Sequence, residues 1–502
     1  MAHSDRWCNR AAWIAAGLGA ALAAVACVLL AMRMLPLGIP RQWFWPLRQT
    51  PVHFGWPAAL SAAVAVAAAA YVIRLLRLRS RVLPDQFVAG VLFCCLVAFG
   101  MMSGLLLAED YPYLRTAQAA CSALSLPYYG AAVAAPDARS LLADYTDLDY
   151  QRSVPQRVRT HPPGAVLYFL YARRAVLASP TLMEASHRLL AADGVLPADA
   201  TLLSHGVSSV TLTGADVAAG LLAGLALTFV GVLAPAALFL VAWALGDPRT
   251  GLLAALLAAA IPSLLLFVPS IDGLGVVMAL SALAACLWAL RRSSYALAVI
   301  GGLVCAAAFI WSIGLLALSL PLAAVLLSYL RDPQQRRAAL LLALTIAGTF
   351  TAALVLLYLF TGYNAAVNTL QILHVQKQIM AGAGRDRLTW TFLNLYEFAV
   401  FLGPMLALTS LAGLACVLRR GGHAGYMGAG LLAALLILNA SGSTRGEVGR
   451  IWVFFMPLFA VYAAHLRHFI TQTSWRWYFP LLLAAQIAVT MFLFAYIIPV
   501  QP

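Results

Sequence analysis

"RAALLLALTIAGTFTAALVLLYLFT", residues 337–361, is an apolar run that carries a single charge, at its first position. A run of about 20 apolar residues crosses the hydrocarbon core of a bilayer as one helix. Similar runs recur throughout the 502 residues, of which 63% are hydrophobic and only 10% charged. The sequence therefore predicts an all-α polytopic membrane protein.

The recurring apolar runs predict about thirteen spans. Segment 164–179 is excluded because Arg173 and Arg174 occupy its middle, where charge is costly in lipid, and we expect it to lie at the interface. The expected spans are 11–32, 53–76, 87–107, 215–245, 250–269, 271–290, 294–311, 313–330, 337–361, 393–418, 425–440, 451–466 and 477–499.

The spans form one integral domain, 1–502, because the longest polar stretches, 108–163 and 180–214, contain apolar residues that need a surface to rest on. Two spans occupy 1–86. A central part, 87–361, contains a partly helical outer loop at 108–214. The remaining spans, in 362–502, have outer loops at 362–392 and 440–450. In the first of these loops Val367, Leu370 and Leu373 follow a helical period, which predicts a helix lying on the membrane above a site.

Basic residues set the orientation of the spans. With the amino terminus cytoplasmic, the inner segments hold 16 arginines and four acids, a balance of +12, and the outer segments hold 16 basic residues and 14 acids, a balance of +2. Short inner loops such as "RLLRLRSR" (74–81), "RDPQQRR" (331–337) and "RRGG" (419–422) carry the excess. The net charge of +14 is thus explained by orientation, and nucleic acid is not needed as a partner.

Polar motifs gather in the outer loops, and the first is a carboxylate pair, Glu109 and Asp110, at the end of the third span. A fixed carboxylate can accept the proton of an attacking hydroxyl group. A pair that simply ends a helix in water fits the position equally well.

A second acidic group, Asp144, Asp147 and Asp149, offers oxygen ligands for a divalent cation or for sugar hydroxyls. A solvated loop with Asx turns is the favoured alternative for these residues. Metal dependence stays open, and the sequence assigns no cofactor with certainty.

Outer arginines are candidates for binding phosphate, because a guanidinium group binds it in a bidentate manner at headgroup depth. Contact with ordinary lipid headgroups is the alternative. Glu447 stands between Arg445 and Arg450 in the sequence, which favours a specific binding pocket. Asp272 in "VPSIDG" indicates either a polar cavity or a turn. The candidates are Arg385, Arg387, Arg445 and Arg450.

The order of "EDYPYL" (109–114), "HPP" (161–163) and "IPSLLLFVPSID" (261–272) resembles the protein O-mannosyltransferases and lipid A aminoarabinose transferases of the GT-C superfamily, a family-39-like group. The resemblance covers 87–292. It implies a GT-C core with Glu109 or Asp110 as catalytic base, although those families have Asp-Glu where this chain has Glu-Asp. Tyr113, within the first of these motifs, and Asp149, from the second acidic group, are further expected substrate contacts.

"THPPG" (160–164) raises the question of why two prolines stand beside a histidine and two arginines in so apolar a chain. Pro162 and Pro163 predict a rigid elbow that begins the helix 164–179. His161 then reaches a lipid phosphate or an acceptor hydroxyl. An incidental histidine at a helix start is the alternative.

These features predict an inverting glycosyltransferase of the GT-C type in a bacterial inner membrane, with its active site on the outer face. The donor is a sugar on a polyprenyl-phosphate carrier, and the acceptor is an extracytoplasmic glycan, lipid or protein. Membrane lipids are its other partners. A transporter or lipid flippase, or a non-catalytic envelope assembly protein, remains the alternative.

Overall fold

The computed structural model describes residues 2–77 and 84–498, in which helices predominate. Two predicted features reach beyond them: part of the basic segment 74–81 and residue 499 of the last span. The α-helices are α1 Ala2–Ala31, α2 Trp56–Arg77, α3 Pro84–Leu106, α4 Pro112–Cys121, α5 Tyr128–Ala134, α6 Ala138–Asp144, α7 Leu148–Ser153, α8 Gln156–Arg159, α9 Gly164–Leu177, α10 Pro180–Ala192, α11 Pro197–His205, α12 Gly214–Val230, α13 Ala234–Leu245, α14 Pro248–Ala258, α15 Pro262–Leu266, α16 Ile271–Arg292, α17 Tyr295–Trp311, α18 Ser319–Leu330, α19 Arg336–Thr361, α20 Ala365–Gly382, α21 Arg387–Leu402, α22 Pro404–Arg420, α23 Gly422–Ser441, α24 Val448–Ile451, α25 Met456–His465 and α26 Gln472–Tyr496. The 3-10 helices are η1 Gly231–Leu233, η2 Ile313–Leu318, η3 Val453–Phe455 and η4 Leu466–His468, and the strands β1 Gly38–Ile39 and β2 Trp43–Phe44 pair antiparallel.

The prediction of an all-α, multi-pass membrane protein is confirmed at this level. Within the described residues, nine helical segments are long and apolar enough to cross a bilayer, or ten if the bent pair α21–α22 is one span. Four predicted spans differ from straight long helices. Segment 250–269 is divided between α14 and α15, α17 has 17 residues, α21 and α22 meet at 103°, and 451–466 is divided among α24, η3 and α25. The number of crossings stays a prediction.

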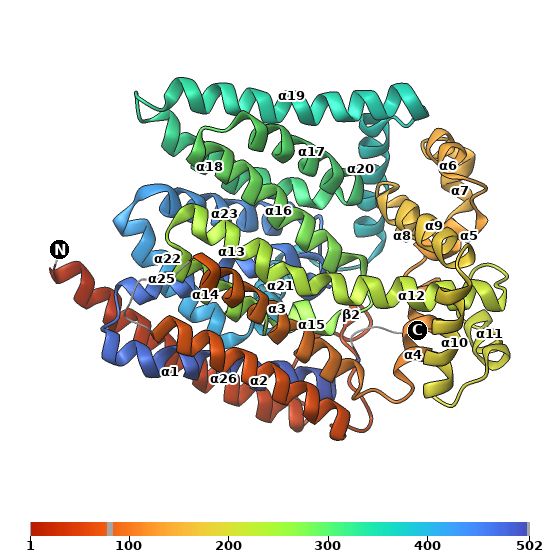
Figure 1. The fold of residues 1–502 in the computed structure, drawn as a ribbon, viewed down its shortest axis with the longest axis horizontal. Helices are drawn as coiled ribbons and strands as arrows, with labels where there is room; N and C mark the ends of the chain where they lie inside the picture. The colour runs from red at the N-terminus through yellow and green to blue at the C-terminus, as the bar shows by residue number, and fades with distance from the viewer. Residues whose placement is uncertain (1, 78–83, 499–502) are drawn as a thin grey trace.

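The long helices run side by side, and α4–α11 form a compact lobe at one end of the bundle (Figure 1). We call this part, residues 112–205, the outer lobe. Its core contains the buried rings of Tyr129, Tyr145 and Phe169, together with Ile271 and Trp311 from the bundle. The outer lobe is therefore packed directly onto the ends of α16 and α17.

Helix α9 occupies the segment that the sequence places at the interface. Its 14 residues correspond to about 21 Å, less than the thickness of a bilayer core. Arg173 donates to Asp216 at 2.7 Å, and Arg174 donates to the carbonyl of Pro136 at 2.9 Å. Both arginines thus bind partners within the protein, Arg174 inside the outer lobe and Arg173 at its junction with α12.

The predicted helix of the 362–392 loop is α20, which runs across the ends of the long helices (Figure 1). Val367, Leu370 and Leu373 are exposed along it, as the helical period predicts. On other faces Gln371 donates to the carbonyl of Thr146 and Gln376 to that of Ser443, each at 2.9 Å. Helix α20 thus connects the outer lobe to the loop between α23 and α24.

The amino-terminal segment is integrated with the rest of the bundle. Helix α1 packs against α22 and α26, and Cys8 forms a disulfide with Cys416 of α22. The chain after α1 then forms the β1–β2 hairpin at the end of the bundle where the outer lobe lies (Figure 1). This hairpin brings Trp43, Trp45 and the nearby Arg48 to the polar loops.

The bend between α21 and α22 depends on Gly403. Its φ is +96°, and an added Cβ would lie 2.2 Å from Oε1 of Gln486. Only glycine fits such a backbone without strain or collision. Because of the bend, α21 runs in a different direction from α22. Polar residues of α21 therefore reach the loop that precedes α24.

Candidate functional site

Six polar residues from the outer lobe and the bundle meet where these two parts join. We call them the central polar cluster. The outer lobe supplies Tyr128 at the start of α5, Arg157 in α8 and His161 just after α8; the bundle supplies Asp272 in the first turn of α16 and Glu447 and Arg450 around α24. Four of these, His161, Asp272, Glu447 and Arg450, are residues that the sequence predicts for the site.

His161 occupies a position fixed by the chain around it. Its Nδ1 lies 3.0 Å from the hydroxyl oxygen of Tyr128 and 3.0 Å from the carbonyl oxygen of Arg157. Burial lowers the pKa of His161, so the ring is neutral at pH 7. Burial also raises the pKa of Tyr128, which keeps its hydroxyl protonated and able to donate. The pair therefore adds polar groups to the cluster without adding charge.

The proline elbow of the THPPG motif is confirmed. Pro162 and Pro163 are buried, and Pro163 is the residue that caps α9. A glycine is needed at position 164, because an added Cβ would lie 2.5 Å from the carbonyl oxygen of Ile310 in α17. The motif thus seats the outer lobe closely against the bundle, with His161 at the junction.

Four charged side chains connect the two halves of the central polar cluster. Glu447 lies 2.6 Å from Nη2 of Arg450 and 3.7 Å from Nη2 of Arg157. The Nε of Arg450 lies 3.8 Å from Asp272, whose other neighbour is the hydroxyl of Ser270. Two guanidinium groups therefore face two carboxylates, and the carboxylate of Glu447 is shared between the outer lobe and the bundle.

The turn that carries Glu447 is strained, and α21 supports it. Glu447 has a φ of +58°, in the left-handed region, where a residue other than glycine costs about 1–2 kcal/mol. The N–H of Gly446 donates to Asn394 at 3.1 Å, and the N–H of Gly449 donates to Glu397 at 2.9 Å. Trp45 donates to the same oxygen of Glu397 at 2.8 Å. These bonds set the direction of Glu447 and Arg450.

The predicted carboxylate pair lies at the end of α3, and its two members have different surroundings. Glu109 accepts hydrogen bonds from Arg48 on both oxygens and from Arg115 at 2.6 Å. Asp110 is exposed, and its side chain has no hydrogen bond or ion pair within the described residues. Asp110 is thus the accessible member of the pair, and neither carboxylate contacts the central polar cluster there.

The predicted outer arginines separate into two groups. Arg450 belongs to the central polar cluster. Arg445 donates to the backbone carbonyl of Arg385 at 2.6 Å, and Arg385 donates to that of Arg445. Arg387 donates to the carbonyl of Ala440. In this conformation Arg450, Arg387 and the Arg385–Arg445 pair are directed to separate partners, and a role of these arginines in binding phosphate stays a prediction.

Tyr113 and Asp149, both expected to contact substrate, do not join the cluster. The backbone N–H of Tyr113 donates to Asp193 at 2.8 Å, which fixes the start of α4. Asp149 is 92% exposed on its side chain and pairs with Arg152 at 3.3 Å.

The possible metal site of Asp144, Asp147 and Asp149 is not formed. Asp147 caps α7 and accepts from the N–H of Asp149 at 2.6 Å. In the part of the chain that the structure describes, no three His, Cys, Asp or Glu residues lie close enough to hold a metal ion. The Asx-turn alternative is the correct one for Asp147, because its carboxylate is used by the local backbone.

Several site residues were missed in the sequence. Arg157 stands within the conspicuous "RVRTHPP" segment, and its charge beside the motif was the available signal. Tyr128, Arg48 and Trp43 had no comparable signal, because their importance depends on contacts across 33 to 342 positions of chain. Comparisons of this chain with protein-family models, with curated proteins and with solved structures find no match.

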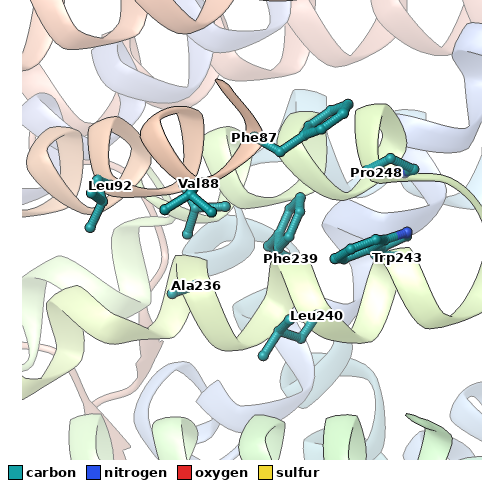
Figure 2. Close-up of a pocket in the computed structure, with 9 residues that line it drawn as sticks. Phe87, Val88, Leu92, Ala236, Phe239, Leu240, Trp243 and Pro248 are labelled. Carbon is teal, nitrogen blue, oxygen red and sulfur yellow. The ribbon is translucent and has the colours of Figure 1, made fainter. Parts of the chain in front are cut away.

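An apolar groove of about 480 Å³ lies between α3, α13 and α14 (Figure 2). Phe87, Val88, Phe239 and Trp243 are among its lining residues, and none of the predicted site residues lines it. The groove is therefore separate from the polar groups described above.

Proposed function

We propose that the protein is a glycosyltransferase that moves a sugar from a polyprenyl-phosphate carrier to an extracytoplasmic acceptor. The acceptor class is a cell-envelope glycan, a lipid or a protein. The observation that carries the proposal is the central polar cluster, where Arg157 and Arg450 from two parts of the fold meet at one end of an apolar bundle. The GT-C fold type, an inverting reaction and a bacterial inner membrane location, with a cytoplasmic amino terminus, belong to the same proposal.

The reaction needs a group that stabilises the leaving phosphate. As the acceptor oxygen forms its bond to the anomeric carbon, the bond from that carbon to the carrier phosphate breaks, and the electron pair stays on the phosphate oxygen. Arg157 and Arg450 supply guanidinium groups for this developing charge. Glu447 and Asp272 hold these groups in place before the phosphate binds.

The acceptor hydroxyl must lose a proton in the same step, and we assign that proton to Asp110. Its carboxylate is exposed, whereas both oxygens of Glu109 already accept hydrogen bonds from arginines. Glu109 is then the positioning residue that holds Arg48 and Arg115 at the end of α3. Asp110 must come within hydrogen-bonding reach of the acceptor for this role.

The proposal is tested by incubating purified protein in nanodiscs with a panel of polyprenyl-phosphate sugars and envelope acceptors. We expect transfer by the wild type and a loss of about 10²-fold or more for Asp110→Asn, the size of effect general-base catalysis gives. Glu184→Gln is the matched control, because Glu184 is an exposed acid of the outer lobe that pairs with Arg188 in the same helix. Wild-type transfer by Asp110→Asn would show that the base is assigned wrongly, and no transfer with any donor would reject the function.

A lipid transporter is the second candidate, and one observation favours it. Glu397 is 5% exposed inside the bent pair α21–α22. Broken helices and buried acids are typical of transport sites. Under this alternative Glu397→Gln would slow the movement of a labelled polyprenyl phosphate between leaflets of reconstituted vesicles, measured with a membrane-impermeant quencher. Equal rates in protein-free vesicles would exclude it.

A further inference from the structure

Beside the central polar cluster lies a second group of residues, which the proposed reaction does not use. We call Trp43, Arg385, Trp390 and Arg445 the tryptophan–arginine cluster. The guanidinium carbon of Arg385 lies 5.5 Å from the ring centre of Trp43 and 5.7 Å from that of Trp390. These distances allow cation–π attraction with both rings, so the guanidinium is held in a defined orientation.

The cluster has hydrogen-bond donors without acceptors. Nε1 of Trp43, Nε of Arg385 and Nε of Arg445 are each buried and unpaired. A buried donor without a partner costs about 1–3 kcal/mol, and three in one place are unusual in a folded protein. A bound ligand that supplies hydrogen-bond acceptors would explain why these three buried donors have no partner in the protein.

The two arginines of the cluster form no direct ion pair within the described residues. Arg385 and Arg445 are neighbours that bond to each other's backbone carbonyl, and both are only partly exposed. No carboxylate lies within 4 Å of either guanidinium in residues 2–77 and 84–498. Glu447 and Glu397 attract Arg385 from farther away, and Asp386 interacts with Arg445. The two arginines still repel each other, and an anion bound directly between them would reduce that repulsion.

The surrounding chain is shaped to form this cluster. Gly446 has a φ of +91°, and an added Cβ would lie 2.6 Å from Cδ1 of Trp43 and 3.1 Å from Cζ3 of Trp390. The indole nitrogen of Trp390 donates to Gln42 at 2.8 Å, which fixes that ring from the hairpin side. Three separate parts of the chain therefore converge here: the β1–β2 hairpin, the start of α21 and the loop before α24.

We propose that the tryptophan–arginine cluster is a binding site for a phosphate group, separate from the central polar cluster. Two guanidinium groups match the charge of a phosphate monoester, which is close to −2, and arginine binds phosphate through paired N–H groups. On binding, the guanidinium groups turn from the backbone carbonyls to the phosphate oxygens, and the indole N–H of Trp43 adds a third donor. The site stands whether or not the protein transfers sugars.

Two sources of the phosphate are distinguished in separate arms of one experiment. Full-length protein in phosphatidylcholine nanodiscs is titrated with inorganic phosphate, and nanodiscs are prepared with and without phosphatidic acid. A ligand that binds only the folded state raises the unfolding temperature, and the rise gives the affinity. Stabilisation by inorganic phosphate identifies a soluble ligand, and stabilisation by phosphatidic acid alone identifies a lipid headgroup; either result supports the site.

Variants assign the binding to the cluster. We expect Arg385→Gln and Arg445→Gln each to weaken binding by roughly tenfold to a hundredfold, the effect of losing a charge-assisted hydrogen bond. Trp43→Phe keeps an aromatic face beside Arg385 but removes the indole N–H together with the five-membered ring, so we expect it to weaken binding, and its unfolding temperature without ligand is measured alongside. Arg387→Gln is the matched control, because Arg387 bonds only to the carbonyl of Ala440.

Two results would overturn the proposal. One is the absence of stabilisation in both arms for the wild type. The other is unchanged affinity in Arg385→Gln, Arg445→Gln and Trp43→Phe, which would place the phosphate elsewhere. Since the readout is binding without sugar donor, failure here is distinct from failure of the proposed transfer reaction.

Discussion

Nη2 of Arg157 in the outer lobe lies 3.7 Å from the carboxylate of Glu447 in the bundle. The same carboxylate lies 2.6 Å from Arg450, so one acid is shared by two arginines that are 293 positions apart. Such an arrangement leaves each guanidinium group with unused donors. An incoming phosphate can therefore bind both arginines without first breaking a fully satisfied pair.

Arg450→Lys should reduce transfer at matched protein level. Lysine keeps the charge but loses the planar, bidentate geometry through which Arg450 reaches Glu447 and Asp272. We expect a decrease of roughly tenfold to a hundredfold, corresponding to about 1.5–3 kcal/mol for a charge-assisted bond. Arg152→Lys, at an exposed site, is the control. If lysine serves as well as arginine at position 450, the assignment of the leaving phosphate to Arg450 is wrong.

Acid should destabilise the protein through His161. Burial lowers the pKa of His161 in the folded state below its usual 6.5, so the unfolded chain binds the proton more tightly. Above pH 6.5 both states are neutral and His161 has no effect. As the pH falls below 6.5, the free energy of unfolding decreases, by at most about 1.4 kcal/mol per pH unit for one proton.

The measurement for His161 is the unfolding temperature between neutral and acidic pH. His161→Asn keeps a donor near the carbonyl of Arg157 but does not titrate, so its loss of stability in acid should be smaller than that of the wild type. If the unfolding temperatures of the two proteins depend on pH in the same way, folding does not lower the pKa of His161.

Labelling of single cysteines tests the orientation of the bundle. Ser153, Ser443 and Gln334 are all exposed. Ser153 ends α7 in the outer lobe, Ser443 accepts a hydrogen bond from Gln376 of α20, and Gln334 belongs to the turn between α18 and α19, which lies at the end of the bundle opposite the outer lobe (Figure 1). In a cysteine-free background we expect an impermeant thiol reagent to label Cys at 153 and 443 from outside intact cells, but not at 334. The reverse pattern would place the central polar cluster on the cytoplasmic side and end the proposed mechanism.

Gly446→Ala should lower stability more than Gly384→Ala. Both glycines have positive φ, which costs alanine about 1–2 kcal/mol. Only at Gly446 does the added Cβ collide, with Trp43 and Trp390, for a total of roughly 2–4 kcal/mol. Gly384 has open space at the same position. Equal unfolding temperatures for the two variants would show that the tryptophan rings can move aside without cost.

The class of the fold follows from local sequence. Whether a segment such as 337–361 can enter lipid depends on its own length and composition, and α19 lies there as expected. The proline elbow at 162–163 and the helix in 362–392 were also readable, because both rest on contacts between neighbours in the chain. The bend within the expected span 393–418 was not predicted, because it depends on a single glycine, Gly403.

The tertiary structure alone decided which polar residues meet. Sequence placed His161, Asp272, Glu447 and Arg450 on the same side of the membrane, and the folded chain brought them together. It also directed Arg445 to Arg385 and joined Glu109 to Arg48, a residue of the amino-terminal segment. Apolar pattern specifies that a helix is buried in lipid but not which helix packs beside it, because lipid tails and leucine side chains are equally apolar. The partners are fixed by close packing at glycines and by bonds between distant loops, and neither is visible in a local window of sequence.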